Sequence, residues 1–327
     1  MADMLVYALH YEGAFNKNSL GAVSEGARVA AALGGEAHAV VVGDSATDEL
    51  CAQLGRYGAS RVLRVPGPEG LAQPVVDAMA ALFAARGYSY ALFGGGLLGF
   101  EIGAGLAARL GAGVAMEVTG VRVEEGRLLA ERPILGDSAI SLITFKGERG
   151  IVIGRLNAFE ASEGGGEAAV EEVSVSFEDF STRARMVSRG EQRGESVDIE
   201  GADILVAGGR GLGKAESFAL CTDLAAALGP ASAVAATRAV VDAGWYPYAG
   251  QIGQTGKTVA PKLYVAAGIS GAIQHKVGMA GSENIVAINK DANAPIFEFS
   301  DLGVVGDLNK ILPKLTAALR ARRDGGA

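Results

Sequence analysis

The sequence predicts an α/β protein with two doubly wound domains, each built on a mostly parallel sheet. The chain has 327 residues, more than twice the roughly 150 of a typical domain. Apolar runs alternate with alanine-rich segments along both halves, as in repeated strand–helix units. The 48 Gly and 9 Pro residues stay well below the roughly 25% of low-complexity chains, so the glycines are expected in folded turns.

The first half contains short apolar runs that do not alternate with polar residues. Such runs are typical of parallel strands covered on both faces. We expect strands at residues 4–9, 39–42, 61–65 and 90–93. We expect helices at residues 20–33, 48–57 and 72–86, and from the Gly94-Gly95-Gly96 turn to residue 110. Ser19 is the expected N-cap of the first helix, and the glycine turn is interpreted as a tight strand–helix connection.

The periodicity changes in the next segment. Short strands joined by turns such as Glu125-Gly126 are expected at residues 118–123, 127–132, 140–145 and 151–153, and they indicate an antiparallel extension of the first domain. The composition shifts between residues 160 and 200, so we place the boundary between domains 1–191 and 192–327. This connecting segment is interpreted as solvated rather than as a partner-docking site, although it carries Arg183, Arg185, Arg189 and Arg193.

The second half returns to the α/β pattern. Strands are expected at residues 204–207, 232–236, 263–269 and 285–289. Helices are expected at residues 215–228, 272–279 and 308–320. A ligand of such a domain would bind where loops and helix N-termini meet at the carboxyl ends of the strands.

The charge balance and the hydropathy exclude several classes of protein. The 29 Lys and Arg residues against 37 Asp and Glu give a net charge of −8, which argues against a nucleic-acid partner. The longest uncharged stretches have 14 residues, fewer than the roughly 18 of a membrane-spanning helix. Residues 1–11 lack a basic leader, and Cys51 and Cys221 form no C-x-x-C motif. We therefore expect a cytoplasmic protein with reduced cysteines and without a transmembrane segment.

Three glycine-rich turns are candidates for ligand binding. Residues 208–215 (GGRGLGKA) fit G-x-x-x-x-G-K but lack the final Ser or Thr, which argues against an ATPase. The free N–H groups of this turn and Arg210 could bind an anion, or the turn could be only a tight connection with a surface arginine. Residues 244–257 form a long loop that is uncharged up to its last residue, Lys257, and such a loop is more often functional than idle.

Residues 268–272 (GISGA) resemble a nucleophile elbow, but the motif fails at Ala272 and no triad order follows. The simplest role for Ser270 is a helix N-cap. His10, His38 and His275 are isolated, with no metal-ligand spacing, so we expect no metal site. The residues alone thus support an anion- or nucleotide-binding domain without evident acid–base machinery.

Several blocks of the second half resemble the alpha subunit of electron transfer flavoproteins. They occur in order at residues 208–211 (GGRG), 253–257 (GQTGK), 263–275 (LYVAAGISGAIQH), 285–291 (IVAINKD) and 294–297 (APIF). The first half matches mainly in layout. The resemblance implies that the C-terminal domain binds one FAD and that a beta subunit completes the cleft.

The resemblance also implies particular contacts with FAD. Arg210 would contact the phosphate–ribose region, Arg238 the isoalloxazine ring, and the Thr255 hydroxyl the neighbourhood of N5. Ser270 and the backbone after it would bind the pyrophosphate, while His275 would lie near the pyrimidine carbonyl. The whole implied set is Arg210, Thr237, Arg238, Ile252, Gly253, Gln254, Thr255, Ser270, Gly271, Ala272, Ile273, Gln274, His275, Asn289, Asp307 and Leu308.

One of these positions departs from the family's usual residue, and another has an alternative interpretation. Thr237 stands where the family commonly has Ser, which retains a hydroxyl. Arg238 could instead pair with Asp242, four residues further on. Arg238, a helix N-terminus after Gly271 and His275 are residue types that would stabilise negative charge on a reduced flavin.

The implied function is that of an electron carrier and not of a substrate-transforming enzyme. It would take electrons from flavin dehydrogenases, with acyl-CoA dehydrogenases of fatty acid beta-oxidation as the expected donors, and pass them to a membrane quinone oxidoreductase. An alternative is a flavin-bifurcating carrier that uses NADH. A protein of a different class, a non-redox nucleotide-binding regulator, would also account for the α/β pattern.

Overall fold

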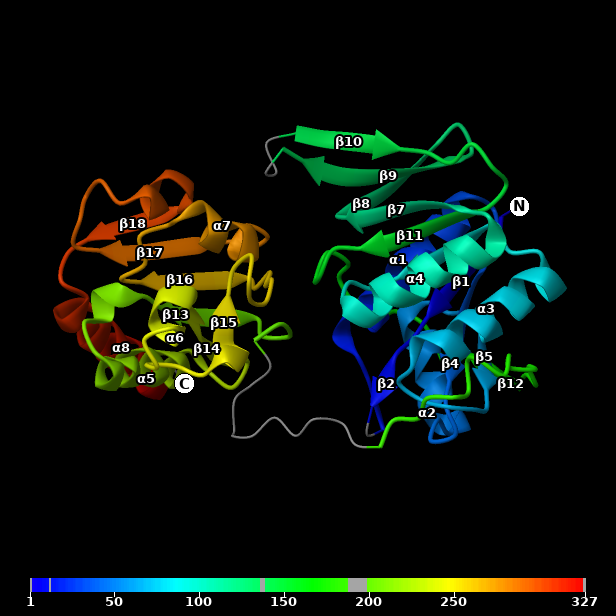
Figure 1. Cartoon of the computed structure of the whole chain (residues 1–327), viewed down its shortest axis with the longest axis horizontal. Coiled ribbons are helices and arrows are strands. Elements are labelled where there is room, and N and C mark those ends of the chain that lie inside the picture. The colour runs from blue at the N-terminus through cyan, green and yellow to red at the C-terminus, as the bar shows by residue number, and fades with distance from the viewer. Residues whose placement is uncertain (1, 12, 136–138, 188–198, 326–327) are drawn as a thin grey trace. The chain divides into compact units, whose positions relative to one another are not determined.

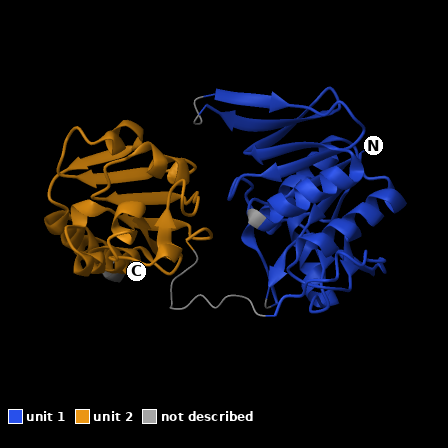
Figure 2. Ribbon diagram, in the orientation of Figure 1, with its two compact units in different colours: residues 1–190 blue, residues 191–327 orange. Residues whose placement is uncertain are grey.

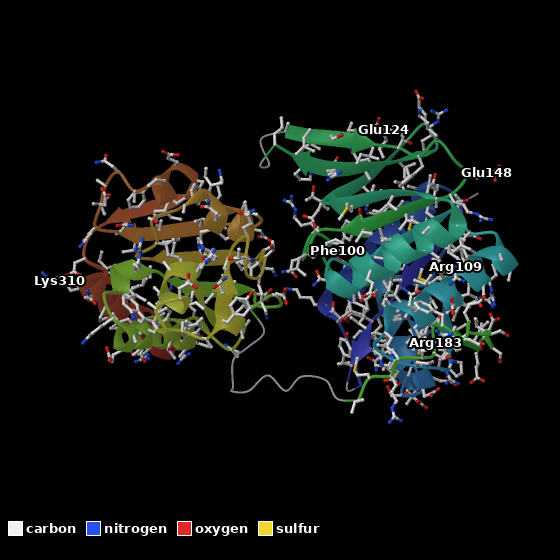
Figure 3. The ribbon with its side chains drawn as sticks, viewed as in Figure 1. Phe100, Arg109, Glu124, Glu148, Arg183 and Lys310 are labelled. Atoms are coloured by element: carbon white, nitrogen blue, oxygen red, sulfur yellow. The ribbon has the colours of Figure 1, made fainter. Side chains whose placement is uncertain are left out.

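The computed structural model describes residues 2–11, 13–135, 139–187 and 199–325. The chain divides into two compact units, residues 1–190 and 191–327 (Figure 2). Arg183 and Arg185 are exposed, and Arg183 lies at the surface of the first unit (Figure 3). The predicted boundary at residue 191, Arg189 and Arg193 lie outside the described residues.

The first unit is built on a seven-stranded sheet of order β12-β5-β4-β1-β6-β11-β7, in which each neighbouring pair is parallel (Figure 1). The strands are β1 (Met4–Tyr7), β4 (Ala37–Val42), β5 (Arg61–Val65), β6 (Tyr90–Phe93), β7 (Gly113–Val118), β11 (Gly150–Gly154) and β12 (Ala169–Glu172). A short hairpin adds β2 (His10–Tyr11) and β3 (Ala14–Phe15).

Apolar cores cover both faces of this sheet, as the uninterrupted apolar strands predict. Val6 belongs to one core with residues of α1 (Lys17–Ala32), and its neighbour Leu5 belongs to the other. That second core includes residues of α3 (Ala72–Arg86) and α4 (Leu97–Leu110). Between β4 and β5, α2 (Asp48–Ala52) continues as a 3-10 helix, η1 (Gln53–Tyr57). The predicted doubly wound α/β class is therefore confirmed.

Two local predictions in this unit are wrong. Asn16, not Ser19, caps α1, because the helix already begins at Lys17. The Asn16 side chain accepts a hydrogen bond from the Asn18 N–H. The hydroxyl of the buried Ser19 instead accepts from the Leu9 N–H at 3.0 Å. The predicted strand at 151–153 does not join the antiparallel extension. It becomes β11 in the parallel sheet, where all five of its residues are buried.

The antiparallel extension itself is a three-stranded sheet of order β10-β9-β8. Its strands are β8 (Gly120–Glu124), β9 (Arg127–Ile134) and β10 (Ala139–Ile143). The Gly94–Gly95 turn is closely packed, because a Cβ at Gly94 would lie 2.4 Å from the Asn18 carbonyl oxygen and one at Gly95 2.3 Å from the Leu156 nitrogen. This agrees with a tight strand–helix connection.

The second unit is built on a six-stranded parallel sheet of order β15-β14-β13-β16-β17-β18 (Figure 1). The strands are β13 (Ile204–Gly208), β14 (Ser232–Thr237), β15 (Gln251–Ile252), β16 (Leu263–Ala267), β17 (Ile285–Asn289) and β18 (Leu302–Val305). The helices are α5 (Phe218–Leu228), α6 (Arg238–Val241), α7 (Ile273–Met279) and α8 (Leu308–Gly325). Four 3-10 segments lie between them: η2 (Arg210–Leu212), η3 (Ala215–Ser217), η4 (Tyr248–Gly250) and η5 (Pro295–Phe299).

The strand order of this sheet changes direction at β13. The chain adds β14 and β15 on one side, then crosses to the other side with β16, β17 and β18. Residues of α5 and α8 pack in one core, and residues of α7 and η5 pack in the other. The point between β13 and β16 is a topological switch point, where α/β sheets leave a crevice beyond the strand ends.

Cys51 and Cys221 are buried and unbonded, as expected. In the described part of the chain, no helix combines the length and the hydropathy that crossing a bilayer needs.

Candidate functional site

A cleft of about 680 Å³ opens at the switch point of the second unit. Its lining comes from the segments that follow β13, β14, β15, β16 and β17. The volume lies within the roughly 300–1,000 Å³ of ordinary ligand sites. Segments distant in the sequence therefore converge on one concave site.

The inner wall of the cleft is made of backbone. The turn after β13 contacts the turn after β16, with the Gly211 N–H donating to the Gly268 carbonyl at 2.9 Å. A Cβ on Gly211 would lie 2.6 Å from the Gly268 Cα, and one on Gly209 would lie 2.5 Å from the Gly268 oxygen. Gly268 also has a φ of +66°. These positions need glycine, and the absence of side chains lets a ligand approach the backbone.

Backbone donors border the cleft beyond β16. Within the described residues, the N–H groups of Ser270, Gly271 and Ala272 have no hydrogen-bond acceptor. Ala272 is the N-cap of α7, so the interpretation of Ser270 as an N-cap is wrong. Successive free N–H groups after a positive-φ glycine form an anion-binding concavity.

Two guanidinium groups and two carboxylates line the cleft, those of Arg210, Arg238, Asp242 and Asp291. Arg210 and Arg238 are both exposed and both line it. The Arg238 Nε lies 3.2 Å from the Asp242 carboxylate, so the alternative i,i+4 pairing is formed. Asp242 also lines the cleft, so the pairing leaves Arg238 available to a ligand. Guanidinium groups and free N–H groups together suit a phosphate-bearing ligand.

His275 is buried in the cleft wall, with its Nε2 2.8 Å from the hydroxyl of the fully buried Tyr264. Burial lowers the pKa of His275 to about 4, and the nearby Ile252 backbone opposes that shift only partly. Its Nδ1 is buried and makes no hydrogen bond to the described residues. The ring of His275 is therefore neutral near neutral pH.

The structure brings most of the predicted site residues together. Those that line the cleft are Arg210, Thr237, Arg238, Ile252, Gly253, Gln254, Thr255, Ser270, Ala272, Gln274, His275 and Asn289.

Four others are not in the lining. Gly271 is buried against the backbone of Ile296, and Leu308 packs in the core. The side chain of Ile273 points away from the core and is 77% exposed. The Asp307 carboxylate accepts a hydrogen bond from the Asn309 N–H at the start of α8. Their contact with a ligand stays a prediction.

Sequence reasoning missed other residues of the lining. Ala239, Asp291, Ala294 and Pro295 line the cleft but were not among the expected contacts. The last three lie in the blocks at 285–291 and 294–297 that carry the family resemblance, so those blocks contained the signal. Gly209, Gly211, Gly268 and Ile269 lie in the glycine-rich turns that the sequence marked as candidates, but their packing against each other in the cleft wall appears only in the structure.

The residues present fit a dinucleotide. Free backbone N–H groups and two guanidinium groups suit a pyrophosphate. Ile252 and Ile269 add apolar surface for a ring system. The fold and this cleft define a dinucleotide-binding α/β protein.

Comparison with known families identifies the dinucleotide. The electron transfer flavoprotein FAD-binding domain matches residues 198–280, and the electron transfer flavoprotein domain matches residues 4–178. The electron transfer flavoprotein subunit alpha of Mycobacterium leprae (strain TN) is 42% identical over 99% of this chain and 100% of its own length. Protein FixB of Clostridium saccharobutylicum is 39% identical over 95% of this chain and 94% of its own length. The subunit alpha of Clostridium acetobutylicum is 36% identical, over 97% and 96%.

The chain belongs to the family of electron transfer flavoprotein alpha subunits, and its second domain is an FAD-binding domain.

Proposed function

We propose that this chain is the FAD-carrying subunit of a soluble electron shuttle. It takes electrons from flavin dehydrogenases, acyl-CoA dehydrogenases of fatty acid beta-oxidation in particular, and delivers them to a membrane quinone oxidoreductase. The observation that supports this most is the cleft at the switch point, because its two arginines, Arg210 and Arg238, lie within the region matched by the FAD-binding domain. FAD, when bound, supplies the capacity to accept and release electrons one or two at a time.

The residues of the cleft divide the work of holding the cofactor. The free N–H groups at 270–272 and the Arg210 guanidinium would bind the pyrophosphate end. The Arg238 guanidinium would stabilise negative charge at the ring end. His275 would lie beside the cofactor as a neutral ring held by Tyr264.

The chemistry of a carrier is consistent with these groups. Electron transfer between flavins needs orientation, a suitable electrostatic environment and exclusion of water. It does not need a general base placed against a substrate carbon. The roles proposed for Arg210, Arg238 and His275 are binding and electrostatic ones, which favours a carrier over a substrate-transforming enzyme.

The proposed partner is a beta subunit, in a cytoplasmic heterodimer. The names of the relatives as alpha subunits imply such a partner. Ile273 and Val277 lie four residues apart on α7, beside the cleft, and are 77% and 54% exposed. Residues at this spacing share one helix face, and exposed apolar pairs of this kind are suited to burial by another chain.

A second carrier function is the flavin-bifurcating one with NADH as donor. The different name of one relative, Protein FixB of Clostridium saccharobutylicum, supports this second candidate function. The same cleft would serve either carrier.

Anaerobic titration of the heterodimer distinguishes these functions. Bleaching of the flavin absorbance by a reduced acyl-CoA dehydrogenase, without bleaching by NADH, supports the proposal. Rapid bleaching by NADH supports the bifurcating carrier instead. A purified complex without a flavin absorbance band would contradict both and favour a non-redox nucleotide-binding regulator.

A further inference from the structure

Gln251 is a buried polar side chain beside the cleft rather than in its lining. It begins β15 and is only 2% exposed. Its Nε2 lies 3.0 Å from the Thr255 carbonyl oxygen and 3.2 Å from the Thr255 hydroxyl oxygen. Thr255 lines the cleft. A buried amide therefore contacts a residue that faces the ligand.

The chemistry of these two contacts determines the orientation of the amide. A backbone carbonyl oxygen can only accept, so the Gln251 atom beside it must be the nitrogen. That nitrogen has two hydrogens, one for the carbonyl and one for the Thr255 hydroxyl. The hydroxyl oxygen accepts from Gln251, which leaves its own hydrogen to point elsewhere.

The loop between the two residues is closed by its backbone. The Lys257 N–H donates to the Gln251 carbonyl at 2.7 Å, and the Gly253 N–H donates to the Lys257 carbonyl at 3.1 Å. Gly256 permits this closure, because a Cβ there would lie 2.4 Å from the Gln251 oxygen. The hydroxyl of Thr255 is thus held at the cleft in a loop with little freedom.

We propose that Gln251 is a positioning residue that holds the Thr255 hydroxyl as a hydrogen-bond donor toward an acceptor atom of the flavin ring. The inference rests on the proposed flavin carrier and takes N5 as the acceptor, which is the position implied by the resemblance. A donor held in this direction favours a flavin with a lone pair at N5. It disfavours one that carries a hydrogen there, because two hydrogens would then face each other.

The probe for this hydrogen bond is 5-deaza-FAD, in which a C–H group replaces N5 and cannot accept. The measured quantity is the ratio of the two dissociation constants, 5-deaza-FAD over FAD, for the deflavinated heterodimer. One net hydrogen bond contributes about two- to tenfold to this ratio. Thr255→Val should lower the ratio by that factor, and Gln251→Met should lower it nearly as much.

Tyr248→Phe is the matched control. The Tyr248 hydroxyl donates to the same Thr255 carbonyl at 2.9 Å but does not contact the Thr255 hydroxyl. Tyr248→Phe should therefore keep the wild-type ratio. Gln251→Leu provides a second variant should Gln251→Met not fold, because it also removes the amide donor from the Thr255 hydroxyl.

The double variant separates positioning from a general structural role. If Gln251 acts through the hydroxyl, Gln251→Met should not change the ratio further in the Thr255→Val background. A wild-type ratio in both Gln251 variants, or an equal additional loss in the Thr255→Val background, would overturn the inference. These are binding measurements, so they stand apart from the donor titrations that test the carrier function.

Discussion

Arg210 and Arg238 have the same charge but different surroundings. The Arg238 Nε lies 3.2 Å from Asp242, whereas Arg210 has no ion-pair partner within the described residues. Both line the cleft, so each can contact FAD. The carboxylate of Asp242 partly offsets the positive charge of Arg238, and both side chains are well exposed, so solvent screens the field of the pair.

We expect different effects from replacing the two arginines. Arg238→Ala should lower the one-electron reduction potential of the bound flavin by tens of millivolts, since about 1.4 kcal/mol corresponds to roughly 59 mV for one electron. Arg238→Lys should have a smaller effect, and Asp242→Asn should raise the potential.

Arg210→Ala should weaken FAD binding by about tenfold, with little change in the potential, because a charge-assisted hydrogen bond is lost far from the ring. Spectroelectrochemistry and dissociation constants measure both effects. Equal potentials in wild type and Arg238→Ala would contradict this assignment.

His275 gives the stability of the chain a dependence on pH. Its pKa is lowered from 6.5 to about 4 by burial, so the unfolded chain binds a proton in this range that the folded chain does not. The His275 contribution to stability is complete above pH 6.5 and is lost as the pH falls toward 4. Between about pH 7 and about pH 5, we expect a loss of about 2 kcal/mol from this group.

Urea unfolding of the full chain at several pH values measures this loss. His275→Asn, which cannot take up the proton, should show a shallower fall in the free energy of unfolding. An identical pH dependence in the two proteins would contradict the neutral form of His275.

At the scale of elements, the cleft depends on two turns whose backbones touch. The turn after β13 and the turn after β16 come from adjacent strands. Gly268 has a φ of +66°, and a Cβ there would lie 2.7 Å from both the Gly211 Cα and the Leu308 Cδ2. The glycines thus serve the packing of one strand–helix turn against another, in addition to the conformation of each turn.

Gly268→Ala should therefore be costly. Gly244→Ala is the control, because Gly244 has a similar φ of +72° with nothing within 4 Å of its added Cβ. Both variants carry the left-handed backbone penalty of about 1 kcal/mol. Gly268→Ala should lose about 1–3 kcal/mol more, from overpacking, and should bind FAD less tightly. Urea unfolding of both variants measures the difference, and equal destabilisation would argue against the close approach.

At the scale of the whole molecule, each unit has its own sheet and its own cores. The described lining of the cleft comes from the second unit alone. Ile273 and Val277 are exposed on the helix beside it. Because the exposed apolar side chains of Ile273 and Val277 are suited to burial by another chain, we expect retention of FAD to depend on the proposed beta subunit.

Production with and without the beta subunit tests this dependence. We expect nearly one FAD per heterodimer and poor FAD retention by the alpha chain alone, measured as flavin absorbance per protein after gel filtration. Tight stoichiometric binding by a monodisperse alpha chain would contradict the expectation.

The sequence by itself determined the fold class, many element boundaries and most of the cleft. The predicted elements at 61–65, 72–86, 90–93 and 285–289 have the same bounds as β5, α3, β6 and β17. Apolar runs, alanine-rich segments and glycine turns are local signals, so a linear sequence displays them directly. The resemblance supplied residues such as Arg238 and Thr255 because they lie in compact blocks.

Only the tertiary structure decided how distant segments meet. The strand at 151–153 looked like its antiparallel neighbours, yet β11 pairs with β6 and β7 in the parallel sheet. The neutral state of His275 follows from burial against Tyr264, and the direction of the Thr255 hydroxyl follows from Gln251. Strand partners, desolvation and hydrogen-bond direction all depend on which atoms surround a residue after folding, and local periodicity does not specify those atoms.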